Sequence, residues 1–471
     1  MVVAAAKSTA PPLRTWGPNM RTSDQLRREA LQIWHAGVAA VAGDRLVREH
    51  VLIQDDRLRV GQASFDLKDI DRIAVVGGGK AGAAMAVGLE QSLGESLLAE
   101  KRVCGWVNVP EGSARSTSHI HLHPARPPSV NEPTESGVLG ARRILELVGS
   151  LGKRDLCIVL LSGGGSALLP APAEGVSLAD KVAVTRLLSA SGATIEELNT
   201  VRRSLSSIKG GGLARACRAG TLVALIISDV MGDALPSIAS GPTVLEPTTA
   251  ADARAVLDRY IDRDEDFAGR LYSFLENRPA EMCAQISTRV HNFVIGNNAR
   301  AVQAAGAEAR RLGYTPEMRS AQGPEGLAED IGCQLAALAS AMRDGRGPDC
   351  LISGGEPVVQ LVESGRRGKG GRNQQLALAA AQALWDDGAE RITLLSGGTD
   401  GEDGPTDAAG AMVAASVIRR AKELGQTPER YLESNDAYRF FAPLDALLIT
   451  GATGTNVCDV RVVVVDRSVG I

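Results

Sequence analysis

A lysine inside a glycine-rich loop is the first residue of this chain whose type and position suggest chemistry. Residues 75–85 read VVGGGKAGAAM, in which an apolar run leads into a segment with helical spacing, so the loop joins a buried strand to a helix. Gly77, Gly79 and Gly82 fit G-x-G-x-x-G, a motif typical of dinucleotide binding at a helix N-terminus. Lys80 lies inside this motif, where its charge suits a transferring phosphoryl group better.

A second cationic loop, RRGKGGRNQQ (366–375), precedes a long alanine-rich segment with helical spacing. It places Lys369 and Arg372 among glycines and directly before the expected helix. A helix N-terminus and a guanidinium group both favour a bound phosphate or carboxylate. A solvated basic loop is the alternative. The position of the loop after a strand-like run favours binding.

Carboxylates gather in two further glycine-containing loops. ISDVMGD (227–233) supplies Asp229 and Asp233, and SGGTDGEDGPTDAAG (396–410) supplies several more. Mg²⁺ prefers such oxygens and usually binds one or two carboxylates together with phosphates. We therefore predict Asp233, Asp400 and Asp407 as metal ligands and Asp229, or less favourably Asp233, as a general base. For Glu402 and Asp403, formation of Asp-Gly turns is an equally good interpretation.

Further residues are predicted to contact phosphate or substrate. Ser162 and Ser166 in LLSGGGSA are interpreted as hydroxyl donors to an anion, because no histidine is near enough in sequence to activate them as nucleophiles. In NTVRRSLSSIKGGGLARA (199–216), helical spacing puts Arg202 and Lys209 roughly on one face. The full set is Gly78, Gly79, Ser162, Gly163, Gly164, Gly165, Ser166, Arg202, Lys209, Gly355, Glu356, Lys369, Asn373 and Gly398.

Other catalytic patterns are missing from the sequence. It contains neither a G-x-S-x-G elbow nor G-x-x-x-x-G-K-[ST]. His119, His121 and His123 alternate and would share one face of a strand, but no cysteine or H-E-x-x-H motif accompanies them. We interpret them as an exposed strand end rather than a zinc site.

The elements that must position these residues are short apolar strands that end in glycine. Five such runs are AVVGGGK (74–80), IVLLSGGGSA (158–167), LISGGEPV (351–358), LLSGGTDG (394–401) and LLITGATGT (447–455). Their lack of polar alternation is typical of strands covered on both faces in parallel sheets. Ligands bind at the carboxyl ends of such strands, where glycine amides can surround anionic oxygens. The pattern predicts an α/β fold with converging anion-binding loops.

Composition restricts the class of protein. The chain has 471 residues, 44% of them hydrophobic and 23% charged, which is typical of a globular protein of two or three domains. A formal net charge of −4 and the lack of a basic stripe argue against a nucleic-acid partner. No uncharged apolar stretch approaches the roughly 18 residues of a membrane helix. Seven scattered cysteines favour reduced thiols, and we expect a cytoplasmic protein.

Three segments are expected along the chain. Residues 1–23 resemble a disordered leader more than a signal peptide. A polar, helical connector at 258–283 places a boundary near residue 285, to within about twenty residues. We therefore predict an N-terminal α/β domain at 24–285 and a C-terminal α/β domain at 286–471.

Eight motifs in order resemble the glycerate 2-kinase family of the two-domain type, which is often described as hydroxypyruvate reductase. The motifs are GGGKAGAAMA, LLSGGGSALLP, NTVRRSLSSIKGGGLA, SDVMGDALPSIASGPT, SGGEPVVQL, GKGGRNQQLAL, SGGTDGEDGPTDAAGA and GATGTNVCDV. They cover about residues 25–465. Where many members read A-G-H-P-x-P-D, this chain reads ARPPSVNEP (125–133), with Arg126 or the upstream His123 in the region of the family's histidine.

This resemblance implies two Rossmann-like α/β domains with mostly parallel sheets and an active-site cleft between them. It implies transfer of the γ-phosphoryl group of ATP to the 2-hydroxyl of D-glycerate, with Mg²⁺, in a monomer or homodimer. The family's essential lysine and arginine correspond to Lys80 and Arg372, which would meet across the cleft. We expect Lys80 to contact transferring or acceptor oxygens and Arg372 to bind the glycerate carboxylate or the developing charge, with the reverse assignment as an alternative.

Two functions of other classes compete with a kinase. An NAD(P)H-dependent hydroxypyruvate reductase would explain G-x-G-x-x-G, but it requires an acidic residue about 20 positions further on, at the end of the next strand. Glu95 and Glu100 lie in a segment that looks helical, and the next strand candidate ends only near Glu111. A sensing protein that kept the cleft without catalysis would not need Lys80 and Arg372.

Overall fold

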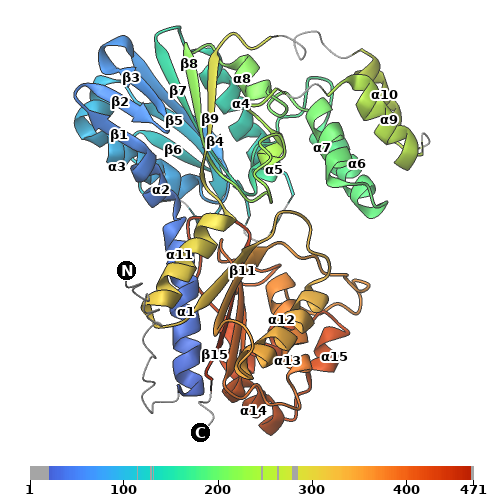
Figure 1. Ribbon diagram of the computed structural model, residues 1–471. Coiled ribbons are helices and arrows are strands. Elements are labelled where there is room, and N and C mark those ends of the chain that lie inside the picture. Colours follow the sequence, from blue (N-terminus) through green and yellow to red (C-terminus); the bar gives the residue numbers. More distant parts are fainter. Residues whose placement is uncertain are drawn as a thin grey trace, which may run out of the picture.

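The computed structural model describes residues 21–113, 115–127, 130, 132–245, 248–262, 265–277 and 285–467. It has two six-stranded sheets, one in each half of the molecule (Figure 1). The predicted leader at 1–23 therefore lies almost entirely outside the described residues. No helix in the described part of the chain is long and apolar enough to cross a membrane.

The first sheet is parallel throughout and has the order β6-β5-β4-β7-β8-β9. Numbered from its first strand, this order is 3-2-1-4-5-6, that of doubly wound dinucleotide-binding folds. The chain order reverses between β4 and β7, and ligands bind at such a switch point. The strands are β4 (Arg72–Gly78), β5 (Cys104–Pro110), β6 (Ile120–Arg126), β7 (Asp155–Ser162), β8 (Thr221–Ile227) and β9 (Arg289–Gly296).

Helices cover both faces of this sheet. Side chains that alternate along β4 and β7 enter two different hydrophobic clusters, one with Met85 and Leu89 of α3 and one with Ile144 of α4. Burial on both faces explains why the strands show no polar alternation. The covering helices are α2 (Gly43–His50), α3 (Gly82–Glu100), α4 (Glu135–Gly149), α5 (Gly165–Leu168) and α8 (Gly212–Ala216). A small antiparallel sheet consists of β1 (Val51–Gln54), β2 (Arg57–Val60) and β3 (Ala63–Asp66), followed by the 3₁₀ turn η1 (Leu67–Asp69).

Four helices form a separate lobe with its own hydrophobic core, which includes Val184, Val201, Leu257 and Leu271 (Figure 1). The sequence pattern predicts only part of this lobe, as a helical connector at 258–283. The helices are α6 (Leu178–Ala190), α7 (Ile195–Ser204), α9 (Ala250–Tyr260) and α10 (Ala268–Glu276). We call this unit the helical lobe. A 3₁₀ turn, η2 (Ile238–Ser240), precedes α9 in the chain.

The second sheet is mixed, with the order β10-β11-β15-β12-β13-β14. Only β10 and β11 pair in parallel, because β15 lies antiparallel between β11 and β12. The prediction of mostly parallel sheets is therefore wrong for this half. The strands are β10 (Pro316–Ser320), β11 (Cys350–Gly355), β12 (Ile392–Gly398), β13 (Gly410–Ala414), β14 (Leu447–Leu448) and β15 (Asp459–Val465).

Helices of the second half cover its sheet on both faces. The helix α1 (Ser23–Ala40) packs there, and the Trp34 indole N–H donates to the Gly397 carbonyl. The others are α11 (Asn298–Arg311), α12 (Ala328–Arg343), α13 (Arg372–Ala383), α14 (Ala415–Glu423), α15 (Pro428–Leu432) and α16 (Ala437–Phe441), with the 3₁₀ turn η4 (Ala442–Leu444).

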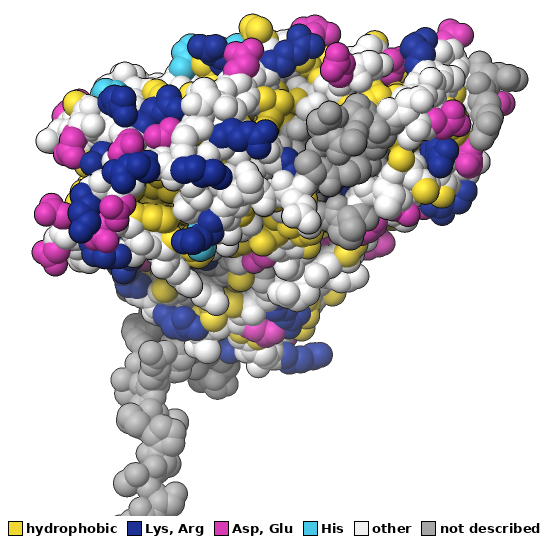
Figure 2. Space-filling view, turned by 90° about the horizontal axis from the view of Figure 1, so that it is seen from above, with side chains coloured by type: hydrophobic (Ala, Val, Ile, Leu, Met, Phe, Trp, Pro, Cys, Tyr) yellow, Lys and Arg dark blue, Asp and Glu magenta, His cyan; other side chains and the backbone are white. Residues whose placement is uncertain are grey.

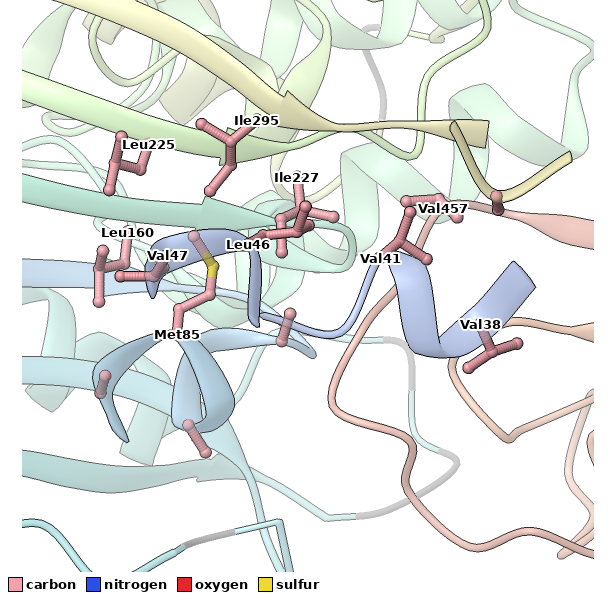
Figure 3. Packing of buried hydrophobic residues seen from close by; sticks show 14 of the residues in the cluster. Val38, Val41, Leu46, Val47, Met85, Leu160, Leu225, Ile227, Ile295 and Val457 are labelled. Carbon is pink, nitrogen blue, oxygen red and sulfur yellow. The ribbon is translucent and has the colours of Figure 1, made fainter. Parts of the chain in front are cut away.

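One hydrophobic cluster is continuous between the halves. Val41, which directly follows α1, lies beside Val457 and faces the core of the first sheet, and Val38 belongs to the same cluster (Figure 3). The last strand of the first sheet, β9, ends at Gly296, within twenty residues of the predicted boundary at 285, and α1 packs with the second half. On the face seen in Figure 2, Lys and Arg are interspersed with Asp and Glu instead of forming one stripe.

Candidate functional site

Two predicted loops meet at the switch point of the first sheet. Lys80 follows β4, and its backbone N–H donates to the Gly163 carbonyl at 2.9 Å. The Ala81 N–H donates to Ser162 Oγ at 2.9 Å. A Cβ on Gly79, whose φ is +149°, would lie 2.1 Å from Ser162 Oγ. Glycine at 79 thus permits this contact between the loops.

The Lys80 side chain crosses to the acidic loop that follows β12. Its Nζ donates to Asp400 Oδ2 at 2.6 Å and to Glu402 Oε2 at 2.9 Å. Burial alone would lower the pKa of Lys80, but these two carboxylates outweigh it and raise the pKa above its usual value. Asp400, predicted as a metal ligand, is a direct partner of Lys80, and Glu402 has a role beyond turn formation.

Arg372 begins α13 and is held by two carboxylates of its own half. Nε donates to Asp459 Oδ2 at 2.8 Å and Nη2 to Asp459 Oδ1 at 3.1 Å. Nη1 donates to Glu356 Oε1 at 2.8 Å. Asp459 is fully buried, and its charge outweighs the effect of burial on the guanidinium, so the pKa of Arg372 is raised. This bidentate pair with Asp459 fixes the orientation of the Arg372 guanidinium plane.

Asp229 interacts electrostatically with Lys80 and with Glu356, which is a partner of Arg372. Its carboxylate accepts the Gly164 N–H at 3.3 Å, and its carbonyl accepts the Cys458 thiol at 2.8 Å. Burial first and the Glu356 charge second raise the pKa of Asp229 to about 6, and Lys80 offsets part of this. Lys80, Asp229, Glu356 and Arg372 therefore belong to one electrostatic neighbourhood built from both halves.

Other site residues gave little or no signal in the sequence. Arg126 at the end of β6 is buried, and burial lowers the pKa of its guanidinium while Glu402 and Asp400 oppose this. Its place in a motif that departs from the family pattern was the only hint. A Cβ on Gly163 would lie 2.1 Å from Asn456 Nδ2, so Asn456 closes the site from the second half. Asp459 lies in the GATGTNVCDV motif, but its residue type and position did not indicate its pairing with Arg372.

The N-terminus of α13 already holds an anion of the protein itself. Asp403 accepts the backbone N–H groups of Asn373 at 3.0 Å and Gln374 at 2.8 Å. Burial raises the pKa of Asp403 to about 6, although these bonds oppose the shift. The Asn373 side chain also contacts Asp403 and accepts from Ser396 Oγ at 2.6 Å. The anion predicted at this helix is thus a carboxylate of the chain, and Asn373 is engaged in binding it.

The predicted metal ligands do not form one cluster. Asp233 accepts Asn297 Nδ2 at 2.6 Å, and Asp407 accepts the Tyr438 hydroxyl at 2.8 Å, which lowers the pKa of Asp407. The Lys369 ammonium lies 4.2 Å from the centre of the Tyr438 ring. Within the described ranges, no group of three or more His, Cys, Asp or Glu side chains is arranged to hold a metal ion.

The other predicted residues lie at the same strand ends. Gly355 ends β11 beside Glu356, and Gly398 ends β12, where a Cβ would lie 2.8 Å from the Glu402 carbonyl oxygen. Ser166 Oγ accepts the Lys209 ammonium at 3.0 Å. His121 and His123 lie on β6 with ring centres 4.1 and 5.2 Å from that of Trp106, away from these loops.

A pocket of roughly 200 Å³ lies beside Lys80. The N-terminal turn of α3, the loop after β5 and the loop after β14 line it, and Arg115 supplies a second cation. This volume is below the roughly 300–1,000 Å³ of pockets for drug-sized ligands. The pocket therefore suits a small acid better than a nucleotide.

Two family models match the chain. One is described as a domain of unknown function, DUF4147, and matches residues 29–273; the other is the MOFRL family and matches residues 349–459.

Relatives cover nearly all of the chain. A glycerate 2-kinase of Pyrococcus horikoshii is 35% identical, over 94% of this chain and 98% of that protein. A putative hydroxypyruvate reductase of Agrobacterium vitis is 41% identical, over 84% of this chain and 99% of that protein. The crystal structure of glycerate kinase from Thermotoga maritima superimposes with a TM-score of 0.75 at 36% identity and covers 94% of this chain and 100% of that one.

Proposed function

Because this chain belongs to the glycerate kinase family, we propose that it is an ATP-dependent glycerate 2-kinase. It transfers the γ-phosphoryl group of ATP to the 2-hydroxyl of D-glycerate and gives 2-phosphoglycerate and ADP. The observation that supports this most directly is the meeting of Lys80 and Arg372, from different halves, around one group of carboxylates. Phosphoryl transfer needs positioning and charge stabilisation more than covalent chemistry.

Lys80 and Arg372 supply the two cations of this mechanism. Lys80 lies between the glycine loop after β7 and the acidic loop after β12, where it can contact the transferring oxygens. Arg372 binds the glycerate carboxylate or the charge that develops during transfer. Asp459 and Glu356 orient its guanidinium before substrate arrives, so little reorganisation is needed during the reaction.

Asp229 is the proposed general base. Its carboxylate would accept the proton of the 2-hydroxyl as the oxygen attacks phosphorus. A pKa of about 6 lets the group stay ionised at neutral pH and still bind a proton more readily than an ordinary aspartate. The small pocket beside Lys80 would hold part of the glycerate backbone.

The residues present suit a magnesium ion. The three cations Lys80, Arg126 and Arg372 share the site with a larger number of carboxylates, which leaves negative charge for a divalent cation to neutralise. These carboxylates are Asp229, Glu356, Asp400, Glu402 and Asp459. While Asp229 acts as the base, Glu356 and the predicted Asp400 are the carboxylates most suited to a divalent cation, with the predicted Asp233 and Asp407 as alternatives. When bound, Mg²⁺ neutralises charge on the phosphates.

An assay that follows both activities tests the function. The protein is incubated with D-glycerate, Mg²⁺ and ATP, or with hydroxypyruvate and NADH, while ADP formation and NADH loss are measured. We expect ADP formation alone, and coupling to enolase without a mutase would identify 2-phosphoglycerate. NADH loss without ADP formation would refute the kinase and favour the reductase. We further propose a cytoplasmic monomer or homodimer, which light scattering and cell fractionation can check.

A further inference from the structure

Three cationic side chains lie where the helical lobe meets the first sheet. Lys181 comes from α6, Arg202 from α7 and Lys209 from the loop after α7. Lys181 and Lys209 are 7% and 3% exposed. Lys181 Nζ donates to the Leu205 carbonyl at 3.0 Å, and Lys209 Nζ donates to the carbonyl and hydroxyl of Ser166 at 2.9 and 3.0 Å. We call these three residues the cation cluster.

The cluster has no acidic partner in the described part of the chain. Both ammonium groups contact only neutral oxygens, and the half-buried Arg202 guanidinium has no hydrogen-bond partner there. The neighbouring Asp180 instead pairs with Arg270. Burial, followed by repulsion from Lys181 and Arg202, holds the pKa of Lys209 well below its usual value. Unpaired buried charges destabilise a fold, and a bound anion would supply the missing opposite charge.

The loop that contacts Lys80 also contacts this cluster. Ser162 accepts from the backbone after Lys80, Gly164 lies beside the Lys80 side chain, and Ser166 accepts from Lys209. The loop at 162–166 therefore connects the catalytic lysine with the cation cluster within five residues. A chain of phosphates that follows this loop would reach both.

A turn with a strained backbone contacts the cation cluster and Ser166. Ala239 and Ser240 have φ angles of +51° and +61°, which residues other than glycine rarely adopt. The Ser240 hydroxyl lies 3.1 Å from Ser166 Oγ, and the Ala239 carbonyl accepts from Lys209 at 3.5 Å. Strain of this kind persists where the surrounding structure holds a functional group in place.

We propose that Lys181, Arg202 and Lys209, together with Ser166, bind the polyphosphate chain of the nucleotide, with its terminal phosphate directed toward Lys80. This rests on the proposed kinase function. Three basic side chains, two of which would gain their full charge when an anion binds, match a multiply charged polyphosphate better than a single carboxylate, and the pocket beside Lys80 suits the small acid. The bound phosphates would also join the helical lobe to the glycine loop.

The test compares Arg202→Met and Lys181→Met with Lys153→Met, an exposed lysine of the same half. Binding of ADP is measured by titration calorimetry, which needs no turnover, and KM values are measured for ATP and D-glycerate. Since a charge-assisted hydrogen bond contributes about 1.5–3 kcal/mol, we expect each cluster variant to weaken ADP binding about tenfold or more. The KM for ATP should rise similarly, while the KM for glycerate and all values for Lys153→Met stay within about twofold.

The outcomes separate this proposal from the kinase assignment. Unchanged ADP binding in folded variants, as judged by thermal melting, refutes the nucleotide site. A rise in the KM for glycerate alone refutes it too, because the cluster would then bind the acceptor. If the wild-type protein binds ADP through this cluster but phosphorylates no glycerate, the binding proposal survives and the proposed function does not.

Discussion

Replacing Asp229 by asparagine should change stability in a way that depends on pH. In the fold, burial and then Glu356 raise its pKa from 3.8 to about 6. A raised pKa means that the folded protein binds a proton more tightly than the unfolded chain does. The stability that the protonated group contributes is therefore complete below about pH 4 and is lost as the pH rises through about 6.

The size of the effect follows from these two values. The gap between 3.8 and about 6 corresponds to roughly 3 kcal/mol at high pH, and about 2 kcal/mol of it develops between about pH 4.5 and 7.5. Asparagine does not titrate and so avoids this loss. It also weakens the long bond from the Gly164 N–H, which costs about 1 kcal/mol at any pH. The variant should gain about 2 kcal/mol relative to wild type across this range.

Urea denaturation at several pH values measures this difference. Asp252→Asn is the control, because hydrogen bonds from Thr249 in the capping box of α9 lower the pKa of Asp252. This group is ionised in both states over most of the range, so the variant should follow the pH dependence of wild type between about pH 4.5 and 7.5, with normal activity. The Asp229 variant should also lose at least tenfold in kcat, and the wild-type rate should fall below about pH 6. If the free energies of unfolding of wild type and Asp229→Asn changed in parallel with pH, the surroundings of Asp229 would not disfavour its ionised form.

Four other variants test the rest of the site. Lys80→Ala and Arg372→Ala should each lower kcat by far more than tenfold, and a loss within about tenfold, worth about 1.4 kcal/mol of barrier, would remove that residue from the mechanism. Asp459→Asn breaks the buried pair with Arg372 and should cost about 3 kcal/mol or more in urea denaturation, so an unchanged midpoint would contradict the role of this pair. Gly163→Ala would put a Cβ 2.1 Å from Asn456 Nδ2 and 2.4 Å from Asp229 Oδ2, so these side chains must shift and kcat should fall about tenfold or more. The control Gly269→Ala meets nothing within 4 Å and should keep full activity; equal rates in both glycine variants would exclude tight apposition at residue 163.

The strands and their glycine ends could be predicted because burial on both faces removes polar alternation. Whether a strand lies parallel or antiparallel to its neighbours leaves no such pattern in the sequence. Val462 to Val465 of β15 are as apolar as the parallel strands, yet β15 lies antiparallel in the centre of its sheet. The last run, LLITGATGT, forms a strand only at Leu447–Leu448, and the rest of it is loop.

Residue type and loop position were enough to single out Lys80 and Arg372, but not their partners. Asp400 and Glu402 are more than 300 residues from Lys80 in the chain, and only the assembled halves bring them together. Asp403, in the loop after β12, accepts the N–H groups at the start of α13, so the chain itself supplies a carboxylate there. Local sequence showed that a carboxylate would suit this position, but it could not show that the chain supplies one.

The placement of α1 and β15 has a consequence for synthesis on the ribosome. Trp34 leaves the ribosome early, but its indole partner at Gly397 follows 363 residues later. β15, the central strand of the same sheet, is made after all its neighbours. The sheet of the first half can thus form before the sheet of the second half is complete. During this time α1 is unburied and available to chaperones.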